Sequence, residues 1–467
     1  MRYSLGEIAQ ITGGIILQGE PSLQVKTVAI DSRTDVSGSL FCAIPGERVD
    51  GHDFVSGVSL KGALGALVER PLKIADPEFG LVLVKSTVAA LGMLASHYRN
   101  PMPLTVVGIT GSVGKTSTKD LIGSVLSRRF KTYKNPGNLN SDIGLPLAVL
   151  GMEPGYSYAV LEMAMRARGE IRDLCRIAKP KIGVLTDISA SHIGVLGSLE
   201  EIALSKAELL EFLPQDGTAF LCWDSEMIRN VSQFANCRKI SYGFHEECDC
   251  RGFDIEPTGD TSSRFRVRFR GSEFAFQLNM AGTHQVQNAL AAVAIGFELG
   301  LSAEEIGCGL TNVTLSPMRQ EIVKTKSLTI INDAYNASVK SMKAALDLLY
   351  ATGKGRKVAI LGDILEMGEY GPEAHFEVGS YARQKADALV AIGSLGVHIK
   401  RGWDRAETQP SDSASWFLDK KSAMDFIVRF LKRGDTCLVK ASRGMEFESL
   451  VACLEDFNGH GIGDEVR

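Results

Sequence analysis

The sequence predicts an α/β protein of three domains, and two observations lead to that prediction. Its 467 residues are about three times the length of an average domain. Through the middle of the chain, and again after residue 317, short apolar runs alternate with segments of helical period. That alternation is typical of mostly parallel sheets covered by helices on both faces. We therefore expect a smaller α/β domain over 1–102, a central parallel-sheet domain over 103–315 and a C-terminal Rossmann-like domain over 316–467.

The first hundred residues alternate short apolar runs with turns. They end at His97–Pro103, where two prolines predict a linker. Within them, Asp31–Phe54 is dense in polar turn residues between strand-like pieces. That composition fits a surface loop as well as a ligand site.

The junction at Leu104–Arg128 carries the strongest chemical signal. A strand-like run breaks into glycines, and a helical pattern begins at Lys115 and Thr116. The amides of such a loop and the helix N-terminus hold phosphate, the lysine can reach the β and γ phosphates, and the threonine can ligate Mg²⁺. We therefore expect a central P-loop ATPase domain; an ordinary glycine-rich turn is the alternative. The residues expected to contact ATP here are Thr110, Gly111, Ser112, Val113, Gly114, Lys115, Thr116 and Ser117.

Buried strands are expected on both sides of the second domain boundary. They span 158–161, 182–185 and 218–222 in the central domain, and 328–331, 358–361, 388–392 and 436–439 in the C-terminal domain. Ser262–Gly282 alternates strictly with period two, which predicts an antiparallel addition with a turn near Gly271. Its row of arginines fits a solvated strand face better than a nucleic-acid surface.

Two polar residues follow central-domain strands, at the edge where parallel sheets bind ligands. Glu162 comes directly after the expected strand at 158–161. Near a bound triphosphate its carboxylate would hold Mg²⁺, and helix capping is the alternative. His192 follows a second strand end, and a structural role explains it as well as contact with a metal or phosphate.

Lys206 lies in the middle of an apolar helical stripe. With a 3.6-residue period, Ile202 and Leu209 share its face, whereas Glu208 and Glu211 point away. Such a lysine must extend to solvent or lose its charge, and a neutral amine can react with CO₂ to give a carbamate that ligates a cation. Helix geometry alone favours the extended, solvent-reaching form.

Composition narrows the class of partner. A net charge of −4 gives no reason to expect nucleic acid. Because no apolar run has signal-peptide or membrane-spanning length, we expect a cytoplasmic protein without membrane insertion. We also expect a monomer.

Several motifs together resemble the Mur ligases of peptidoglycan synthesis, over nearly the whole chain. They are DSR from Asp31, TGSVGKTS from Thr110, NPGNLNSDIGLP from Asn135, LEM from Leu161, SHIGVLGSLEEIALSKAE from Ser191, GTHQVQNALAA from Gly282, SPMRQE from Ser316, NDAYNAS from Asn332, LGDILEMGEYGPEAH from Leu361 and KASRGME from Lys440. The resemblance implies ATP-dependent amide-bond synthesis: a substrate carboxylate takes the γ-phosphoryl group, and an amine attacks the acyl phosphate. NDAYNAS favours the member that adds D-alanyl-D-alanine to UDP-N-acetylmuramoyl-tripeptide.

The resemblance also implies roles for individual residues. Thr116 and Glu162 would hold one Mg²⁺, and His192 with a carbamylated Lys206 would hold a second. Lys115, His192 and Lys206 would then be the catalytic residues. The further implied contacts are Asn288 with adenine, Arg319 and Asp333 with ATP, Ser32 and Arg33 with the UDP end, Asn138 and Asn140 with the muramoyl-peptide, and Tyr335, Asn336, Lys440, Ser442 and Arg443 with the dipeptide and the reacting carboxylate.

Two alternatives remain open. One is the sister ligase that adds the third amino acid, whose Asp-Asn-Pro-Arg motif is absent from this sequence. The other is a P-loop nucleotide switch, which would need no combination of Glu162, His192 and Lys206. The chain also departs from the family motif at Ser338-Val339, where Asn-Pro is usual, so this loop lacks a rigid turn.

Overall fold

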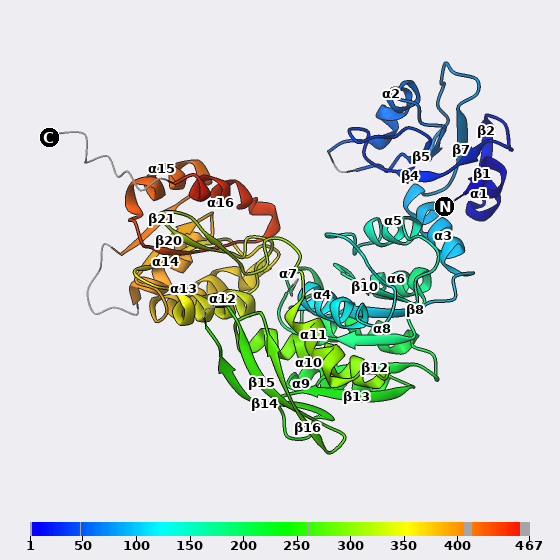
Figure 1. Cartoon of the computed structure of the whole chain (residues 1–467). Helices are drawn as coiled ribbons and strands as arrows, with labels where there is room; N and C mark the ends of the chain where they lie inside the picture. Colours follow the sequence, from blue (N-terminus) through cyan, green and yellow to red (C-terminus); the bar gives the residue numbers. More distant parts are fainter. Residues whose placement is uncertain (1, 47, 192, 260, 406–412, 458–467) are drawn as a thin grey trace.

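The structure is a computed structural model that describes residues 2–46, 48–191, 193–259, 261–405 and 413–457. Within these ranges three large sheets follow one another along the chain. The N-terminal and C-terminal sheets lie on two sides of the central one (Figure 1). The predicted α/β class is confirmed.

The N-terminal sheet has the order β2-β7-β6-β5-β4 in the described part of the chain, and it is parallel except for β2 at its edge. Its strands are β2 (Ile15–Gln18), β4 (Thr27–Ala29), β5 (Ser39–Cys42), β6 (Gly65–Val68) and β7 (Gly80–Leu83); β1 (Tyr3–Ser4) pairs with β3 (Gln24–Val25). Its helices are α1 (Leu5–Thr12), η1 (Gly51–Phe54), α2 (Val55–Leu60) and α3 (Thr87–Arg99).

Helix α3 corrects the predicted linker. It begins at the Ser86 cap and runs through Arg99, so His97–Arg99 are helical and the connection starts only at Asn100. The reason is that Pro101 is the first residue that cannot continue the helix, and that the last turns of α3 are held by packing, since Leu94, Ala95 and Arg99 are buried.

The central sheet has the order β16-β15-β14-β13-β12-β11-β8-β10-β9 over the described ranges. It is parallel from β9 to β14, and β15 and β16 extend it antiparallel. The strands are β8 (Thr105–Thr110), β9 (Thr132–Lys134), β10 (Tyr158–Glu162), β11 (Ile182–Leu185), β12 (Thr218–Cys222), β13 (Arg238–Gly243), β14 (Cys250–Pro257), β15 (Ser263–Phe269) and β16 (Ser272–Leu278). The helices are α4 (Lys115–Leu126), α5 (Gly144–Leu150), α6 (Glu170–Ala178), α7 (Ile193–Leu196), α8 (Leu199–Phe212), α9 (Glu226–Val231), η2 (Ser232–Phe234), α10 (Thr283–Glu298) and α11 (Ala303–Thr311).

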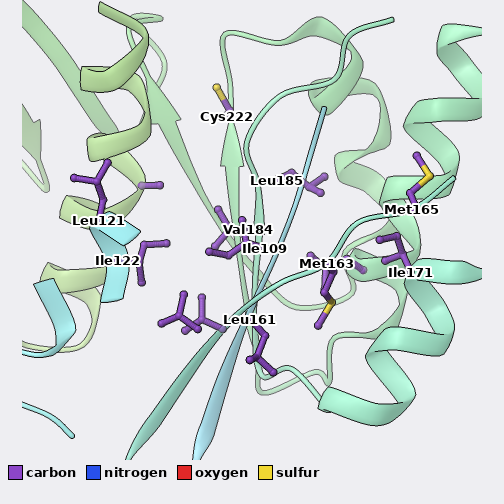
Figure 2. Close-up of a cluster of buried hydrophobic side chains, with 14 of the residues drawn as sticks. Ile109, Leu121, Ile122, Leu161, Met163, Met165, Ile171, Val184, Leu185 and Cys222 are labelled. Carbon is purple, nitrogen blue, oxygen red and sulfur yellow. The ribbon is translucent and has the colours of Figure 1, made fainter. Parts of the chain in front are cut away.

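The core of the central sheet holds β8 in place. Ile109 of β8 lies between β10 and β11 and is fully buried. Figure 2 shows Leu121 and Ile122 of α4 on one side of these strands and Met163 and Ile171 on the other. Because both faces are covered, the loop that follows β8 starts from a rigid base.

The C-terminal sheet has the order β17-β18-β22-β19-β20-β21 where the structure describes it, with β17 antiparallel at its edge. Its strands are β17 (Glu321–Lys324), β18 (Thr329–Asn332), β19 (Lys357–Gly362), β20 (Ala388–Ile392), β21 (Ala414–Phe417) and β22 (Thr436–Lys440). Its helices are α12 (Val339–Thr352), η3 (Gly368–Tyr370), α13 (Gly371–Arg383), α14 (Gly396–Arg405), α15 (Lys420–Phe430), η4 (Arg443–Met445) and α16 (Glu448–Glu455).

The predicted strands agree with the structure to within a residue at each end. The hairpin at 262–282 is also confirmed, because β15 and β16 pair antiparallel around Arg270 and Gly271. Both turn residues have positive φ, 50° and 79°, as a tight hairpin turn requires. On the exposed arginine face, Arg266 and Arg268 pair with Glu273 of the neighbouring strand.

Candidate functional site

A cavity of about 440 Å³ lies where the strand ends of the central sheet face the C-terminal sheet. Most of the predicted site residues line it. They are Ser112, Val113, Gly114, Lys115, Thr116, Ser117, Asn138, Asn140, Glu162, Asn288, Arg319, Asp333, Tyr335, Asn336, Lys440, Ser442 and Arg443. Segments more than 300 residues apart in the sequence therefore meet in one place.

The glycine loop between β8 and α4 is shaped by close contacts. Gly111 has φ 155° and Gly114 has φ 86°, and Gly114 caps α4. A Cβ at Gly111 would lie 2.1 Å from the Thr186 hydroxyl, and one at Gly114 would lie 2.4 Å from Oδ1 of Asn288. Side chains at these two positions would therefore distort the loop.

Hydrogen bonds hold this loop against the segment after β11. The Ser112 amide donates to the Asp187 carbonyl at 2.7 Å, and the Thr186 hydroxyl donates to the Val113 carbonyl at 2.7 Å. The Ser112 hydroxyl donates to the Ser189 carbonyl at 2.9 Å. The loop is thus preorganised, as phosphate binding by backbone amides requires.

Two lysines share one carbonyl of the loop. Nζ of Lys115 and Nζ of Lys206 donate to the Gly111 carbonyl at 2.8 and 3.0 Å. Burial lowers the pKa of Lys115, although the Glu162 carboxylate opposes the shift. Burial lowers the pKa of Lys206 much further, and the positive charge of Lys115 adds to that shift.

Lys206 corrects the expectation from helix geometry. It is 2% exposed and does not extend to solvent. Glu208 was expected to point away from the stripe but is also buried, because its carboxylate accepts the amides of Gly169 and Arg172 and so caps α6. Tertiary contact with α6, which the helical period does not encode, decides the position of Glu208.

Thr116 and Glu162 form a candidate cation site. The Thr116 hydroxyl donates to Oε2 of the buried Glu162 at 2.8 Å, and Nδ2 of Asn140 donates to Oε1 at 2.8 Å. A hydroxyl and a carboxylate beside a phosphate-binding loop are oxygen ligands of the kind Mg²⁺ prefers. No group of three His, Cys, Asp or Glu side chains suited to a metal occurs among the described residues. Bound phosphate and water would therefore have to complete the coordination.

The C-terminal sheet and the segment before it supply three charged side chains to the cavity, those of Arg319, Asp333 and Lys440. Nη2 of Arg319 donates to the Thr116 hydroxyl at 3.0 Å, and its guanidinium lies 4.0 Å from the centre of the Tyr335 ring. Nζ of Lys440 pairs with Asp333 at 2.5 Å and donates to the Asn336 carbonyl at 2.9 Å. Burial lowers the pKa of Lys440, and Asp333 opposes that shift.

Five predicted residues of the described part of the chain do not line the cavity. Three of them are Thr110 at the end of β8, Gly111 in the loop and Lys206, whose Nζ donates to the Gly111 carbonyl. Ser32 and Arg33 belong to the N-terminal sheet region, where Nε and Nη2 of Arg33 donate to the Asp31 carboxylate at 2.9 and 2.8 Å. These bonds lower the pKa of Asp31 to about 2. His192 lies outside the described residues, so its predicted role stays a prediction.

Sequence reasoning missed several residues at the cavity. Asp187 and Lys340 line it and pair with each other at 2.7 Å across the two sheets. Nε2 of His284 lies 3.0 Å from Oε1 of Gln320, which joins α10 to the segment before β17. The sequence did contain a signal for Asp187, which follows shortly after a buried strand at the edge where parallel sheets bind ligands. It contained no such signal for Lys340.

A glycine loop between a strand and a helix faces a second α/β sheet across this cavity, an arrangement typical of enzymes that use a nucleotide and bring two substrates together. Family models for the Mur ligase catalytic domain, the Mur ligase middle domain and the Mur ligase glutamate ligase domain match residues 24–99, 109–296 and 318–443. The chain belongs to the Mur ligase family.

Individual relatives agree over nearly the full length. The UDP-N-acetylmuramoyl-tripeptide--D-alanyl-D-alanine ligase of Bacillus subtilis is 37% identical, covering 97% of this chain and 98% of its own. A crystal structure of MurF from Acinetobacter baumannii superposes with a TM-score of 0.88 at 30% identity, over 98% and 99% of the two chains. MurF from Thermotoga maritima in complex with ADP gives 0.79 at 28% identity, over 92% and 97%.

Proposed function

We propose that the protein is an ATP-dependent, ADP-forming ligase that joins D-alanyl-D-alanine to UDP-N-acetylmuramoyl-tripeptide. The names of the relatives support these substrates, and the ADP complex of the Thermotoga maritima protein supports the nucleotide. The observation that carries the proposal is the shared cavity, where the glycine loop meets Arg319, Asp333 and Lys440 of the other sheet. The relatives do not favour the sister ligase or a nucleotide switch.

The residues of the cavity suit transfer of a phosphoryl group to a carboxylate. Triphosphate and carboxylate repel each other, so positive charge has to be held between them. Lys115 supplies one charge from the loop once its ammonium leaves the Gly111 carbonyl. Arg319 brings a second charge from the C-terminal sheet, which makes the approach of the two sheets part of assembling the site.

Magnesium fits the same place. Thr116 and Glu162 would hold one Mg²⁺, which would neutralise phosphate oxygens and favour transfer. Asn140 would orient Glu162 through the bond to Oε1. We propose Asn288 as a contact of the nucleotide, because it lies against Gly114 at the start of α4.

We further propose that Lys206 carries a carbamate and, with His192, holds a second Mg²⁺. Burial lowers the pKa of Lys206 and so favours the neutral amine that reacts with CO₂. A carbamate keeps one N–H, which can still donate to the Gly111 carbonyl that Nζ now contacts. The reaction of the free amine with ¹³CO₂ should give a carbamate resonance in the ¹³C spectrum that Lys206→Ala lacks. A spectrum identical in both proteins contradicts the proposal.

We propose the remaining roles from the resemblance to the family. Ser32 and Arg33 would bind the UDP end, and Asn138 the muramoyl-peptide. Tyr335, Asn336, Ser442 and Arg443 would face the dipeptide and the reacting carboxylate. We propose the domain limits 1–102, 103–315 and 316–467, which are supported by the observation that no described strand crosses a limit.

A cytoplasmic location is part of the proposal. No described helix has the length and apolar character needed to cross a bilayer. All nine cysteines lie in the described ranges as free thiols, which suits a reducing compartment.

The test of the main proposal is a product assay. Purified protein receives ATP, Mg²⁺ and UDP-N-acetylmuramoyl-tripeptide, with D-alanyl-D-alanine or single amino acids as acceptor, and products are identified by mass. We expect a product enlarged by one dipeptide, and phosphate release that depends on both co-substrates. Phosphate release without either co-substrate would instead indicate a nucleotide switch, and addition of a single amino acid would indicate the sister ligase.

A further inference from the structure

We propose that Lys340 is a positioning residue: by pairing with Asp187 it holds the first turn of α12 against the phosphate-binding loop while the reaction proceeds. The proposal deepens the proposed function, on which it rests. It concerns the segment 333–341, which joins β18 to α12 and lines the cavity with Asp333, Tyr335 and Asn336.

Asp187 is fixed to the phosphate-binding loop. Its carbonyl accepts the Ser112 amide at 2.7 Å, and the preceding Thr186 donates to the Val113 carbonyl at 2.7 Å. The Asp187 residue is 6% exposed. A group that binds its carboxylate therefore takes its position from the loop itself.

Lys340 comes from the other sheet. Ser338 caps α12 by accepting the Ser341 amide, so Lys340 stands in the first turn of the helix. A cation there is disfavoured by the positive end of the helix dipole. Nζ of Lys340 nevertheless lies 2.7 Å from Oδ1 of Asp187, which shows that the carboxylate outweighs the dipole.

A second contact also joins the central region to the C-terminal region. The Gly194 amide of α7 donates to the Glu366 carbonyl at 3.1 Å. A Cβ at Gly194 would lie 2.5 Å from the Gly368 nitrogen, so the two backbones touch. This contact needs no charge, whereas the Lys340–Asp187 pair does. Salt and substitution should therefore separate the two contributions.

Removing Lys340 would leave the buried carboxylate of Asp187 without its ion-pair partner. Oδ2 of Asp187 has no hydrogen-bond partner among the described residues, and Oδ1 is the oxygen that pairs with Lys340. Asp187 and Lys115 line the same cavity, so the negative charge of one acts on the positive charge of the other. Without Lys340, Asp187 would attract the ammonium of Lys115, which the phosphate needs.

The test compares two lysines of one helix. Lys340→Met breaks the pair between the sheets, whereas Lys343→Met breaks the 2.6 Å bond to Glu377, which lies within the C-terminal unit between α12 and α13. Lys340→Met should lower kcat about tenfold and raise the KM for the dipeptide, with less than a twofold change in ADP affinity measured by calorimetry. Lys343→Met should match the wild type, and Lys340→Arg should restore most of the activity.

A double-mutant cycle and scattering complete the design. The effects of Lys340→Met and Asp187→Asn should be strongly non-additive. Small-angle scattering should show a larger radius of gyration for Lys340→Met than for Lys343→Met, and 0.5 M salt should reduce that difference. Equal behaviour of the two methionine variants, or additive effects in the cycle, overturns the proposal. If the wild type ligates no acceptor, the proposed function fails, and scattering still decides whether Lys340 holds the two parts together.

Discussion

The phosphate-binding loop and the Asp31–Arg33 turn both carry predicted substrate contacts, but they are built in opposite ways. In the loop, Thr116 is held by bonds to Glu162 and Arg319, which are far away in the sequence. The Arg33 side chain is 86% exposed and bonds a carboxylate two residues away. The comparison teaches that the first region is preorganised and the second is not, so we expect the first to act in the chemistry and the second to add affinity.

Lys115→Ala tests the preorganised side and should give the largest effect. We expect ligation to fall by about 10³-fold, because a cation held at the transferring phosphate is lost. The thermal midpoint should hardly change, since Lys206 still donates to the Gly111 carbonyl. Product formation and a calorimetric scan measure the two quantities. Lys239→Ala, an exposed lysine on β13, is the control; equal activity of both variants contradicts the loop assignment.

Glu162→Gln should lower turnover by about 10²-fold and raise the Mg²⁺ concentration needed for half-maximal rate. The amide keeps the volume of the carboxylate but loses its charge. Glu208→Gln is a matched control, because Glu208 is as buried but caps α6. That variant should lower the thermal midpoint and leave the Mg²⁺ dependence unchanged. If the two magnesium titrations coincide, Glu162 does not hold the ion.

Lys206→Met should stabilise the folded protein in CO₂-depleted buffer. Burial lowers the pKa of Lys206 in the folded state, so between that pKa and the ordinary lysine value the unfolded chain binds a proton that the folded protein does not. The free energy of unfolding of the wild type therefore rises with pH across this window and levels off above it. Denaturant titrations at several pH values should show a smaller rise for the variant. An unchanged slope would mean that Lys206 stays protonated when buried.

Arg33→Ala should give the smallest effect, a rise of about three- to tenfold in the KM for the UDP substrate. The thermal midpoint should stay within a degree or two, because exposed pairs contribute little to stability. Arg176→Ala removes another exposed pair, with Asp173, and should leave every KM unchanged. A large loss of kcat in Arg33→Ala would place this turn in the chemistry and erase the contrast between the two regions.

Local sequence patterns predicted the fold well where one segment decides the outcome. The apolar runs of β11, β12 and β20 match the expected strands at both ends, since buried parallel strands read as continuous apolar stretches. The glycine loop could be predicted equally well, because its backbone needs glycine at fixed positions. The end of α3 was misjudged because the linker was expected from His97, whereas the helix continues through Arg99 and stops just before Pro101.

Tertiary contacts account for the rest. The period of α8 placed Glu208 outward and let Lys206 reach solvent, but α6 and the Gly111 carbonyl lie over these two residues. The pairing of Asp187 with Lys340 joins positions 153 residues apart, and a helix turn gives no hint of the carboxylate opposite. The family resemblance reached Lys206 by another route, through motif position.

The carbonyl shared by Lys115 and Lys206 has a consequence for the entry of nucleotide. If a triphosphate attracts the ammonium of Lys115 away from the loop, the carbonyl oxygen of Gly111 still accepts a hydrogen bond from Lys206. A buried acceptor is therefore not left without a donor. Lys115 can therefore move without a compensating rearrangement of the backbone. The hydrogen bond from Lys206 to the Gly111 carbonyl keeps the conformation of the loop while Lys115 moves.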